Sequence, residues 1–394
     1  MQRRNASTEC SDRIQRPNAA TECSNFIAKA IVTFFSDQQG MALALEWAAK
    51  GLFITTPNPR VGCVIQKDGI VVGAGHTQIP GQAHAEIQAL ADATARCVDV
   101  RGATLYVTLE PCSHTGRTPP CADALIRAGI KRVVSALVDP NPLVAGQGHA
   151  RLRAAGIEVT TGVMAHEAGE INIGFLKRMA TGLPWVRLKV AASLDGKTAL
   201  HNGRSQWITS AAARDDGHFW RARACAILTG IGTVKSDDPQ LTVRAVETPR
   251  QPRRIIVDSK LDIDPQARIL QTQPCWIVAA HPDPVKAAVL QAQGHEVLDV
   301  PNADGKVDLP ALMRELGRRE MNEVHIEAGT KLNGSLLQSA CVDELLMYIA
   351  PVVLGDAQGM FNLPALTSLD AKQVFRFSEI KQLGPDLRIL ARRS

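Results

Sequence analysis

The chain has few aromatic residues and no long hydrophobic run. Phe, Trp and Tyr together make up 4% of its 394 residues, so the hydrophobic core must be mainly aliphatic. No apolar run approaches the roughly 20 residues that a membrane-spanning helix requires. The segment Phe26–Phe35 is short and interrupted by Lys29, which does not fit the hydrophobic part of a secretory signal. We therefore expect a cytoplasmic protein without a membrane partner.

The chain also lacks the concentrated positive charge of a typical nucleic-acid-binding protein. The net charge is +5, and Lys and Arg are scattered along the sequence rather than gathered in one stripe. Such a weak basic excess suits an anionic small molecule equally well. Hydrophobic residues at 45% and charged residues at 21% are ordinary for a globular protein. The length favours two domains over one core.

Nine cysteines are an odd number in a chain without a secretory signal. We expect them to be reduced thiols, and unusual Cys spacing then indicates a metal before a disulfide. The first 33 residues are polar and contain a near repeat, Asn5–Ser11 and Asn18–Ser24. This composition predicts a disordered tail. Cys10 and Cys23 within it have no neighbours that would complete a set of metal ligands.

Residues 34–180 alternate between helical and strand patterns, which is typical of a sheet covered by helices, an α/β layered domain. Between the first two strands, Lys67-Asp68-Gly69 favours a tight turn with a positive φ at Gly69. The expected helices span 42–50, 84–95, 122–128 and 148–155, and the expected strands span 61–65, 70–74, 104–109, 132–138 and 157–160.

The same alternation begins again after Thr181–Pro184, where Gly and Pro indicate a boundary. We therefore predict a tail (1–33), a first domain (34–180) and a second α/β domain (184–394). In the second domain, helices are expected at 211–224, 309–318 and 335–339, and strands at 185–191, 226–229, 255–258, 276–279 and 323–326.

One imidazole and two thiols occur in the order of a catalytic zinc site. His84 opens a predicted helix, Cys112 ends a predicted strand and Cys121 precedes another helix. Three protein ligands leave the fourth position of a tetrahedral zinc open for water, whereas structural zinc takes four protein ligands. A lone Cys is more often a small buried hydrophobe. The three elements in this order, with Pro111 before the first Cys, predict a zinc site.

Glu86 lies two residues after His84, in the first turn of the same helix. From there its carboxylate can face the water of the metal, take its proton, and return it to the substrate ring and the leaving ammonia. His-x-Glu followed by Pro-Cys-x-x-Cys is the signature of zinc deaminases. The eight residues between Cys112 and Cys121 depart from that spacing.

The loop between Cys112 and Cys121 is rich in hydrogen-bond donors and contains two prolines. A donor-rich loop beside a metal suits a phosphate or a ribose of the substrate. His114 could itself bind the metal, but three ligands are already at hand, so we expect it to contact the substrate. Arg117 could bind a phosphate or be a solvated surface charge.

The first domain resembles the bifunctional riboflavin-biosynthesis deaminase–reductase family. The motifs that carry the resemblance are Pro57–Cys63, His84–Glu86, Glu110–Cys121, Asp139–Pro142 and Val144–Gly146. The resemblance runs from about residue 35 almost to the C-terminus and implies a cytidine-deaminase-like fold that deaminates a phosphoribosyl diaminopyrimidinone. It assigns zinc to His84, Cys112 and Cys121, the proton shuttle to Glu86 and a pyrimidine contact to Asn58. Pro57-Asn58-Pro59 is also an ordinary turn.

The second domain contains no Gly-x-Gly-x-x-Gly fingerprint of dinucleotide binding. Two other segments, Thr229–Val234 and Ile326–Gly334, follow predicted strands and contain glycine. Backbone N–H groups in such positions can bind phosphates, or the glycines can simply serve turns. From the residues alone, both interpretations stay open.

The family resemblance extends to this domain through Lys189–Gly196, Ser205–Ser210, Gly232–Pro239, Leu241–Arg244 and Glu327–Gly329. It implies a dihydrofolate-reductase-like fold that uses NADPH to reduce a ribosyl side chain to ribityl. The implied NADPH-binding residues are Ala191, Trp207, Thr233, Asp237, Ser259, Gly329, Thr330, Lys331, Leu332, Asn333, Gly334 and Ser335. The implied substrate-binding residues are Ser205, Arg221, Leu241, Arg244 and Glu327.

Arg221 and Arg244 are suited to bind the 5′-phosphate of the substrate, because a guanidinium binds phosphate through two hydrogen bonds. Either could instead form a surface ion pair, which contributes little to stability. Thr330 stands where the family usually has Pro. Lys189 or Asp195 could assist proton transfer, and the sequence does not choose between them.

Three functions compete at this point. The first is successive deamination and reduction of a phosphorylated pyrimidine by a homo-oligomer that does not bind nucleic acid. The second is a nucleoside or nucleic-acid deaminase with an accessory domain, for which the scarcity of aromatic stacking residues is unfavourable. The third is a binding protein with a degenerate site, which the complete ligand set disfavours.

Overall fold

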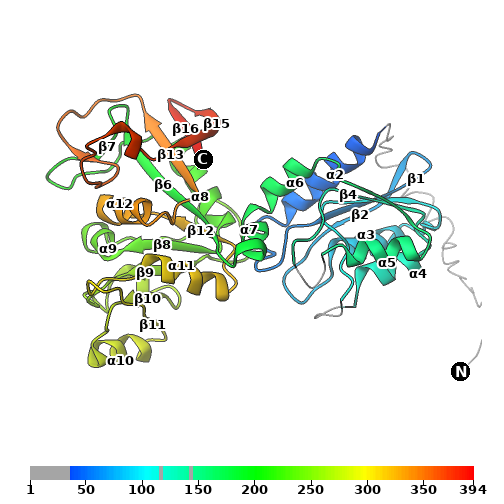
Figure 1. Ribbon diagram of the computed structural model, residues 1–394, viewed down its shortest axis with the longest axis horizontal. Coiled ribbons are helices and arrows are strands. Elements are labelled where there is room, and N and C mark those ends of the chain that lie inside the picture. Colours follow the sequence, from blue (N-terminus) through cyan, green and yellow to red (C-terminus); the bar gives the residue numbers. More distant parts are fainter. Residues whose placement is uncertain (1–35, 115–118, 142–144) are drawn as a thin grey trace, which may run out of the picture.

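A computed structural model describes residues 36–114, 119–141 and 145–394. These residues form two α/β bodies side by side, with helix α7 (Ile173–Thr181) between them (Figure 1). The expected tail with Cys10 and Cys23 lies outside the described residues, as does Arg117.

The first body is built on a five-stranded sheet with strand order β2-β1-β3-β4-β5. Strand β1 pairs antiparallel with both β2 and β3, and β3, β4 and β5 run parallel. Asp68 and Gly69 both have positive φ, 52° and 80°, so the tight turn predicted between β1 and β2 is confirmed. The strands are β1 (Gly62–Lys67), β2 (Ile70–His76), β3 (Thr104–Val107), β4 (Arg132–Ser135) and β5 (Glu158–Thr161).

Helices cover both faces of this sheet. Successive strand residues point to opposite sides, and buried apolar residues occur on both of them. Val64 and Tyr106 belong to the apolar cluster on the side of helices α2 and α6, and Ile65 and Leu105 to the cluster on the other side. The hydroxyl of Ser36 caps α2 by accepting a hydrogen bond from the backbone of Gln39. The helices are α2 (Asp37–Lys50), α3 (Ala85–Ala95), α4 (Cys121–Arg127), α5 (Gln147–Ala154) and α6 (Ala165–Ile171).

Helix α2 lies very close to strand β1. A Cβ atom at Gly62 would lie 1.9 Å from the carbonyl oxygen of Ala44 and 2.4 Å from the backbone nitrogen of Ala48. Only a residue without a side chain permits this approach. Helix α2 and strand β1 therefore form a tightly packed layer just after the Pro57–Arg60 segment.

The second body is built on a nine-stranded sheet with order β11-β10-β9-β8-β12-β6-β13-β16-β15. Its first seven strands are parallel, and β16 and β15 are antiparallel. The strands are β6 (Trp185–Ser193), β8 (Ala226–Gly230), β9 (Arg253–Val257), β10 (Trp276–Ala279), β11 (Glu296–Asp299), β12 (Glu323–Ile326), β13 (Glu344–Ala350), β15 (Phe375–Leu383) and β16 (Asp386–Arg393). Strands β7 (Lys197–Ala199) and β14 (Gln358–Gly359) pair separately.

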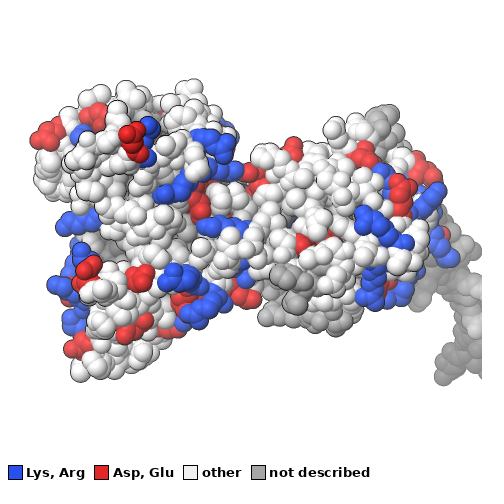
Figure 2. All heavy atoms as spheres, in the orientation of Figure 1, with Lys and Arg blue, Asp and Glu red and all other residues white. Residues whose placement is uncertain are grey.

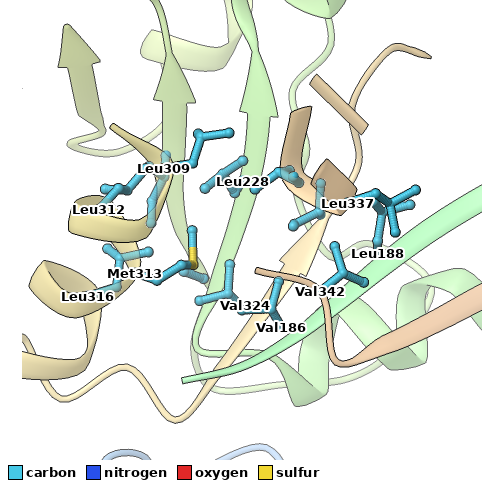
Figure 3. Packing of buried hydrophobic residues seen from close by; sticks show 14 of the residues in the cluster. Val186, Leu188, Leu228, Leu309, Leu312, Met313, Leu316, Val324, Leu337 and Val342 are labelled. Atoms are coloured by element: carbon cyan, nitrogen blue, oxygen red, sulfur yellow. The ribbon is translucent and has the colours of Figure 1, made fainter. Parts of the chain in front are cut away.

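The core of this body lies between the sheet and helices α11 and α12 (Figure 3). In α11 the buried side chains Leu309, Leu312, Met313 and Leu316 follow the helical spacing, and the carboxylate of Asp308 caps the helix at 2.8 Å from the nitrogen of Ala311. The helices of this body are α8 (Ala211–Arg223), α9 (Ile231–Asp237), α10 (Pro284–Ala292), α11 (Leu309–Arg318) and α12 (Thr330–Gln338).

The α/β architecture of both halves and the predicted strands and helices are confirmed within a few residues. The segment Thr229–Val234, for which a phosphate-binding segment and a simple turn both stayed open, runs from the end of strand β8 into helix α9. The helix expected at 335–339 begins five residues earlier, at Thr330. The sequence did not lead us to expect helices α6, α7, α9 and α10 or strands β11, β13, β15 and β16.

Seven cysteines lie in the described parts of the chain. Six of them, Cys63, Cys112, Cys121, Cys225, Cys275 and Cys341, carry free thiols, as expected.

None of the helices within residues 36–114, 119–141 and 145–394 combines the length and hydrophobicity that a bilayer crossing requires.

Candidate active sites

The first candidate site begins at the N-terminal end of helix α3. His84 is the N-cap of this helix, with extended backbone angles, and Glu86 lies in its first turn. Glu86 is only 4% exposed. Burial raises the pKa of its carboxyl to about 7, and the nearby sulfur of Cys112 adds to this effect. A carboxyl with this pKa can both accept and donate a proton near neutral pH.

Cys112 and Cys121 meet His84 at this end of the helix. Cys112 follows strand β3, and Cys121 is the first residue of helix α4. Nδ1 of His84 lies 3.6 Å from Sγ of Cys112 and 3.4 Å from Sγ of Cys121. The three predicted ligands are therefore brought together from separate elements.

The donor set formed by His84, Cys112 and Cys121 fits a zinc ion. Its ligand atoms all lie within 4.8 Å of one another, which is the spread that one ion can bridge. Hydrogen bonding from the thiol of Cys121, and then from His84, lowers the pKa of Cys112 to about 4, although burial opposes this. Contact with Cys112 and burial raise the pKa of Cys121, so the pair favours one thiolate, at Cys112, and a thiolate is the form of cysteine that binds metals.

A cavity of about 330 Å³ opens beside these ligands. The predicted substrate residues Asn58 and His114 line it together with His84, Glu86 and Cys112. The other lining residues were not predicted as site residues, and they include Asp139, Asn141, Arg178, Met179 and Glu320. Glu320 comes from the second body, so both bodies contribute to this cavity.

The carboxylate of Glu110 holds the wall of the cavity in place. Its Oε2 accepts hydrogen bonds from the backbone nitrogens of Asp139 at 3.1 Å and Gly146 at 2.9 Å, and its Oε1 accepts one from His149 at 3.1 Å. Burial then raises the pKa of Asp139 to about 6. Glu110 thus holds the backbone at Asp139, whose buried carboxyl lines the cavity.

The second candidate site lies on the face of the large sheet that helix α8 covers. The guanidinium of Arg221 pairs with both carboxylate oxygens of Glu327, and its Nη2 lies 2.9 Å from Oε2. Nζ of Lys189 lies 3.8 Å from the same carboxylate, and Nε2 of His325 lies 3.4 Å from Oε1. Burial opposes the charge of Glu327, but Arg221 and Lys189 outweigh it and hold its pKa well below the ordinary value.

Several of the predicted NADPH-binding residues lie where the parallel strands of the large sheet end. Ala191 lies near the end of β6, Ser259 follows β9, Thr233 and Asp237 follow β8 on α9, and Gly329 follows β12 as the N-cap of α12. The carboxyl ends of parallel strands are where such sheets bind ligands. This edge therefore brings together residues that are far apart in the sequence.

Two of these segments lie close to each other. A Cβ atom at Gly329 would lie 3.7 Å from the hydroxyl of Thr233, and one at Gly230 would lie 3.1 Å from Leu332. Oδ1 of Asn333 is buried and has no hydrogen-bond partner among the described residues. A buried acceptor without a partner, beside the backbone N–H groups that open α12, fits a dinucleotide.

The remaining predicted residues differ in their exposure. Trp207 is 69% exposed and lies over the guanidinium of Arg214. Leu241 is buried with a positive φ of 49°. Arg244 is exposed, and its backbone nitrogen donates to His218 at 3.2 Å. Ser205 lies in the loop before α8.

The fold and the first site together define a zinc deaminase domain joined to a second α/β domain with a candidate nucleotide site. Residues 35–137 match the family "Cytidine and deoxycytidylate deaminase zinc-binding region", and residues 184–389 match the "RibD C-terminal domain". The "Riboflavin biosynthesis protein RibD" of Escherichia coli is 49% identical over 366 residues, covering 89% of this chain and 98% of that protein. That of Haemophilus influenzae is 44% identical, covering 89% and 95%. The chain belongs to the RibD family.

Solved structures agree with this assignment. RibD of Acinetobacter baumannii superposes with a TM-score of 0.83 at 42% identity and covers 91% of this chain and 99% of its own. A diaminohydroxyphosphoribosylaminopyrimidine deaminase/5-amino-6-(5-phosphoribosylamino)uracil reductase of Thermotoga maritima superposes with a TM-score of 0.82 at 32% identity, covering 91% and 99%. The two-domain architecture is thus shared along the whole matched length.

Proposed function

We propose that the chain deaminates 2,5-diamino-6-(ribosylamino)pyrimidin-4-one 5′-phosphate and then reduces the ribosyl side chain of the product to ribityl. The observation that carries the first step is the meeting of His84, Cys112 and Cys121 beside Glu86 in one cavity. His84, Cys112 and Cys121 would hold zinc, which when bound supplies hydroxide at neutral pH by lowering the pKa of a water to ~7.

Glu86 would move the protons of the deamination. Its carboxylate accepts a proton from the attacking water and passes it to the ring nitrogen. It then takes the proton of the newly added hydroxyl and gives it to the amine, which departs as ammonia as the ring carbonyl forms. Asn58 and His114, which line the same cavity, are suited to hydrogen-bond the pyrimidine and the ribose. Asp139, which lines the same cavity, offers a further carboxyl to the substrate.

The second domain would bind NADPH through Ala191, Trp207, Thr233, Asp237, Ser259 and Gly329–Ser335. The cofactor supplies the hydride, and the protein supplies orientation and electrostatics. Glu327 and Lys189 form a charged pair that can hydrogen-bond the sugar hydroxyls. The carboxylate of Asp195 accepts hydrogen bonds from the backbone nitrogens of Leu354 and Gly355. Lys189 is therefore the better placed of the two groups considered for proton transfer.

The two arginines proposed for the substrate phosphate differ in their contacts. Arg221 already binds Glu327 with Nε and Nη2, and its Nη1 donates to the carbonyl of Thr242 at 3.2 Å. The Nη1 of exposed Arg244 makes one long contact of 3.4 Å to Gln240. These contacts favour Arg244 for the phosphate and Arg221 for orienting Glu327.

Self-association and location complete the proposal. Strand β15 is the outer strand of the large sheet, and its Phe377 and Ile380 are 68% and 57% exposed. Exposed apolar side chains on an edge strand favour pairing between copies, so we propose a homo-oligomer. We also propose that it acts in the cytoplasm. On the face drawn in Figure 2, the described Lys and Arg side chains lie in separate groups. This distribution favours a small substrate over nucleic acid.

The function is tested with the purified full chain, the diaminopyrimidinone ribosyl phosphate and NADPH, following ammonia release and NADPH oxidation separately. Both are expected. Removing the metal with a chelator should abolish ammonia release but not NADPH oxidation with the already deaminated substrate, and added zinc should restore the first activity. Ammonia release that survives complete metal removal would refute the proposed site.

A further inference from the structure

The deaminase cavity is fixed in part by the second domain. The segment Pro57–Arg60 contributes Pro57, Asn58 and Pro59 to the lining of the cavity. Asn322 and Glu323, which are consecutive residues at the start of strand β12, hold this segment at both of its ends. No residue of the reductase site itself is involved.

Asn322 holds the first end of the segment. Its Nδ2 donates a hydrogen bond of 2.9 Å to the carbonyl oxygen of Pro57. Its Oδ1 accepts one of 2.6 Å from Nε of Arg178, a residue of α7 that also lines the cavity. Asn322 is 5% exposed, so both bonds are shielded from water and the loss of either leaves a buried polar group without its partner.

Glu323 holds the second end. Its fully buried carboxylate lies 2.5 Å from Nη1 of Arg60, 2.9 Å from Nε of Arg223 and 3.1 Å from Nη1 of Arg187. Nη2 of Arg60 also donates to the carbonyl of Arg223 at 2.9 Å. A buried carboxylate with three guanidinium partners gives Arg60 a single well-defined position.

Helix α7 packs directly against the start of β12. A Cβ atom at Gly174 would lie 2.4 Å from the carbonyl oxygen of Asn322 and 2.5 Å from Cγ of Glu323. The start of β12, helix α7 and the segment Pro57–Arg60 are therefore packed as one unit, and the position of Asn58 depends on all three.

We propose that Asn322 is a positioning residue for deamination: it fixes the carbonyl of Pro57 and the guanidinium of Arg178, and thereby places Asn58 against the substrate. The inference rests on the proposed deaminase function of the first domain. It predicts that a residue of the reductase half sets the affinity of the deaminase half for its substrate while zinc binding and proton transfer stay unaffected.

The test compares full-length Asn322→Ala and Asn322→Asp with the wild type. Aspartate keeps the acceptor for Arg178 and the size of the side chain but cannot donate to Pro57, and its carboxylate adds a negative charge beside Arg178. Both variants should raise the deaminase KM about tenfold, the factor expected for one or two buried hydrogen bonds. The deaminase kcat, the zinc content and the reductase kcat/KM should stay within about twofold of the wild type, because the substitutions change neither the zinc ligands, nor Glu86, nor the reductase site.

Gln273→Ala is the matched control, because Nε2 of Gln273 also donates to a proline carbonyl, that of Pro252 at 2.8 Å, but within the second body. It should leave the deaminase KM unchanged. An unchanged deaminase KM in both Asn322 variants would overturn the inference, as would equal losses of deaminase and reductase activity. Absence of ammonia release by the wild type in the same assay would instead refute the proposed function itself.

Discussion

At the residue scale, the two arginines of the second site have different partners. Arg221 is tied to Glu327, whereas Arg244 is exposed and has one long side-chain contact. A guanidinium without a strong protein partner is the one that can bind a phosphate through two hydrogen bonds. The assignment of the phosphate to Arg244 follows from this contrast.

Arg244→Ala should raise the reductase KM by about tenfold to a hundredfold, because the substrate loses a charge-assisted contact. The reductase kcat should change little, because the contact is made equally in the ground state and the transition state. Steady-state kinetics with the deaminated substrate checks this, with Arg318→Ala, an exposed arginine on α11, as the control. A KM equal to that of the wild type would remove Arg244 from the substrate site.

The residues of the first site divide according to whether a short motif contains them. We could predict His84, Glu86, Cys112 and Cys121, because their order along the chain is typical of three zinc ligands with a neighbouring proton-transfer carboxylate. Glu320 and Arg178 could not be, because they reach the cavity only through the contact between the two bodies. Asp139 lies in a motif quoted for the resemblance and directly follows the predicted strand 132–138. This position of a carboxylate at the end of a strand was the signal that could have found it.

At the scale of elements, helix α2 and strand β1 approach each other more closely than side chains allow. Gly62 is the residue that permits this, since a Cβ there would overlap the backbone of α2. The strand leads directly from the Pro57–Arg60 segment, so the packing of these two elements also supports the first site.

Gly62→Ala should destabilise the first domain by about 1–3 kcal/mol, the usual cost of overpacking. Its unfolding transition should fall by roughly 5 °C, measured by scanning calorimetry of the full chain. Gly217→Ala in α8 is the control, because a Cβ there meets nothing within 4 Å. An unchanged transition in Gly62→Ala would show that the helix can shift without cost.

Elements were predictable where the local pattern was strong and were missed where packing decides. Strands β8, β9, β10 and β12 are short segments that contain Ile or Val in the parallel part of the sheet, and all four were predicted from the sequence. Helix α9 contains Gly232 and was not predicted, because glycine has a low helix propensity that the buried contact of Val234 overrides. The outer strands β15 and β16 mix charged and apolar residues and were not predicted from the sequence.

At the scale of the whole molecule, a buried group of charges joins the two bodies. Arg60 and Glu323 pair although they lie 263 positions apart. The restart of strand–helix alternation after Pro184 could predict two domains, since that signal is local. No local pattern reports which residues meet across the contact, so this group of charges could not be predicted.

Acid should weaken this contact. Burial alone would raise the pKa of Glu323, but Arg223, Arg60 and Arg187 outweigh it and hold the pKa below its ordinary value of 4.5. The stabilisation from this carboxylate is therefore fully present above pH 4.5, the ordinary pKa of a glutamate. It is lost as the pH falls from there through the lowered pKa of Glu323 in the folded protein.

Glu323→Gln should consequently lower the unfolding temperature of the full chain at about pH 7, and the difference from the wild type should shrink at about pH 3. Thermal unfolding followed by circular dichroism measures both. Glu247→Gln, which removes an exposed carboxylate, should show no such convergence. A difference that stays constant over this pH range would mean that the charge of Glu323 does not stabilise the contact.

The most direct test of the two-site account is the Glu86→Gln variant, assayed for zinc content, ammonia release and NADPH oxidation in one preparation. The account predicts that zinc is retained, that ammonia release falls by about 10²–10⁴-fold, and that NADPH oxidation with the deaminated substrate is unchanged. Ammonia release at the wild-type rate, or a parallel loss of both activities, would contradict it.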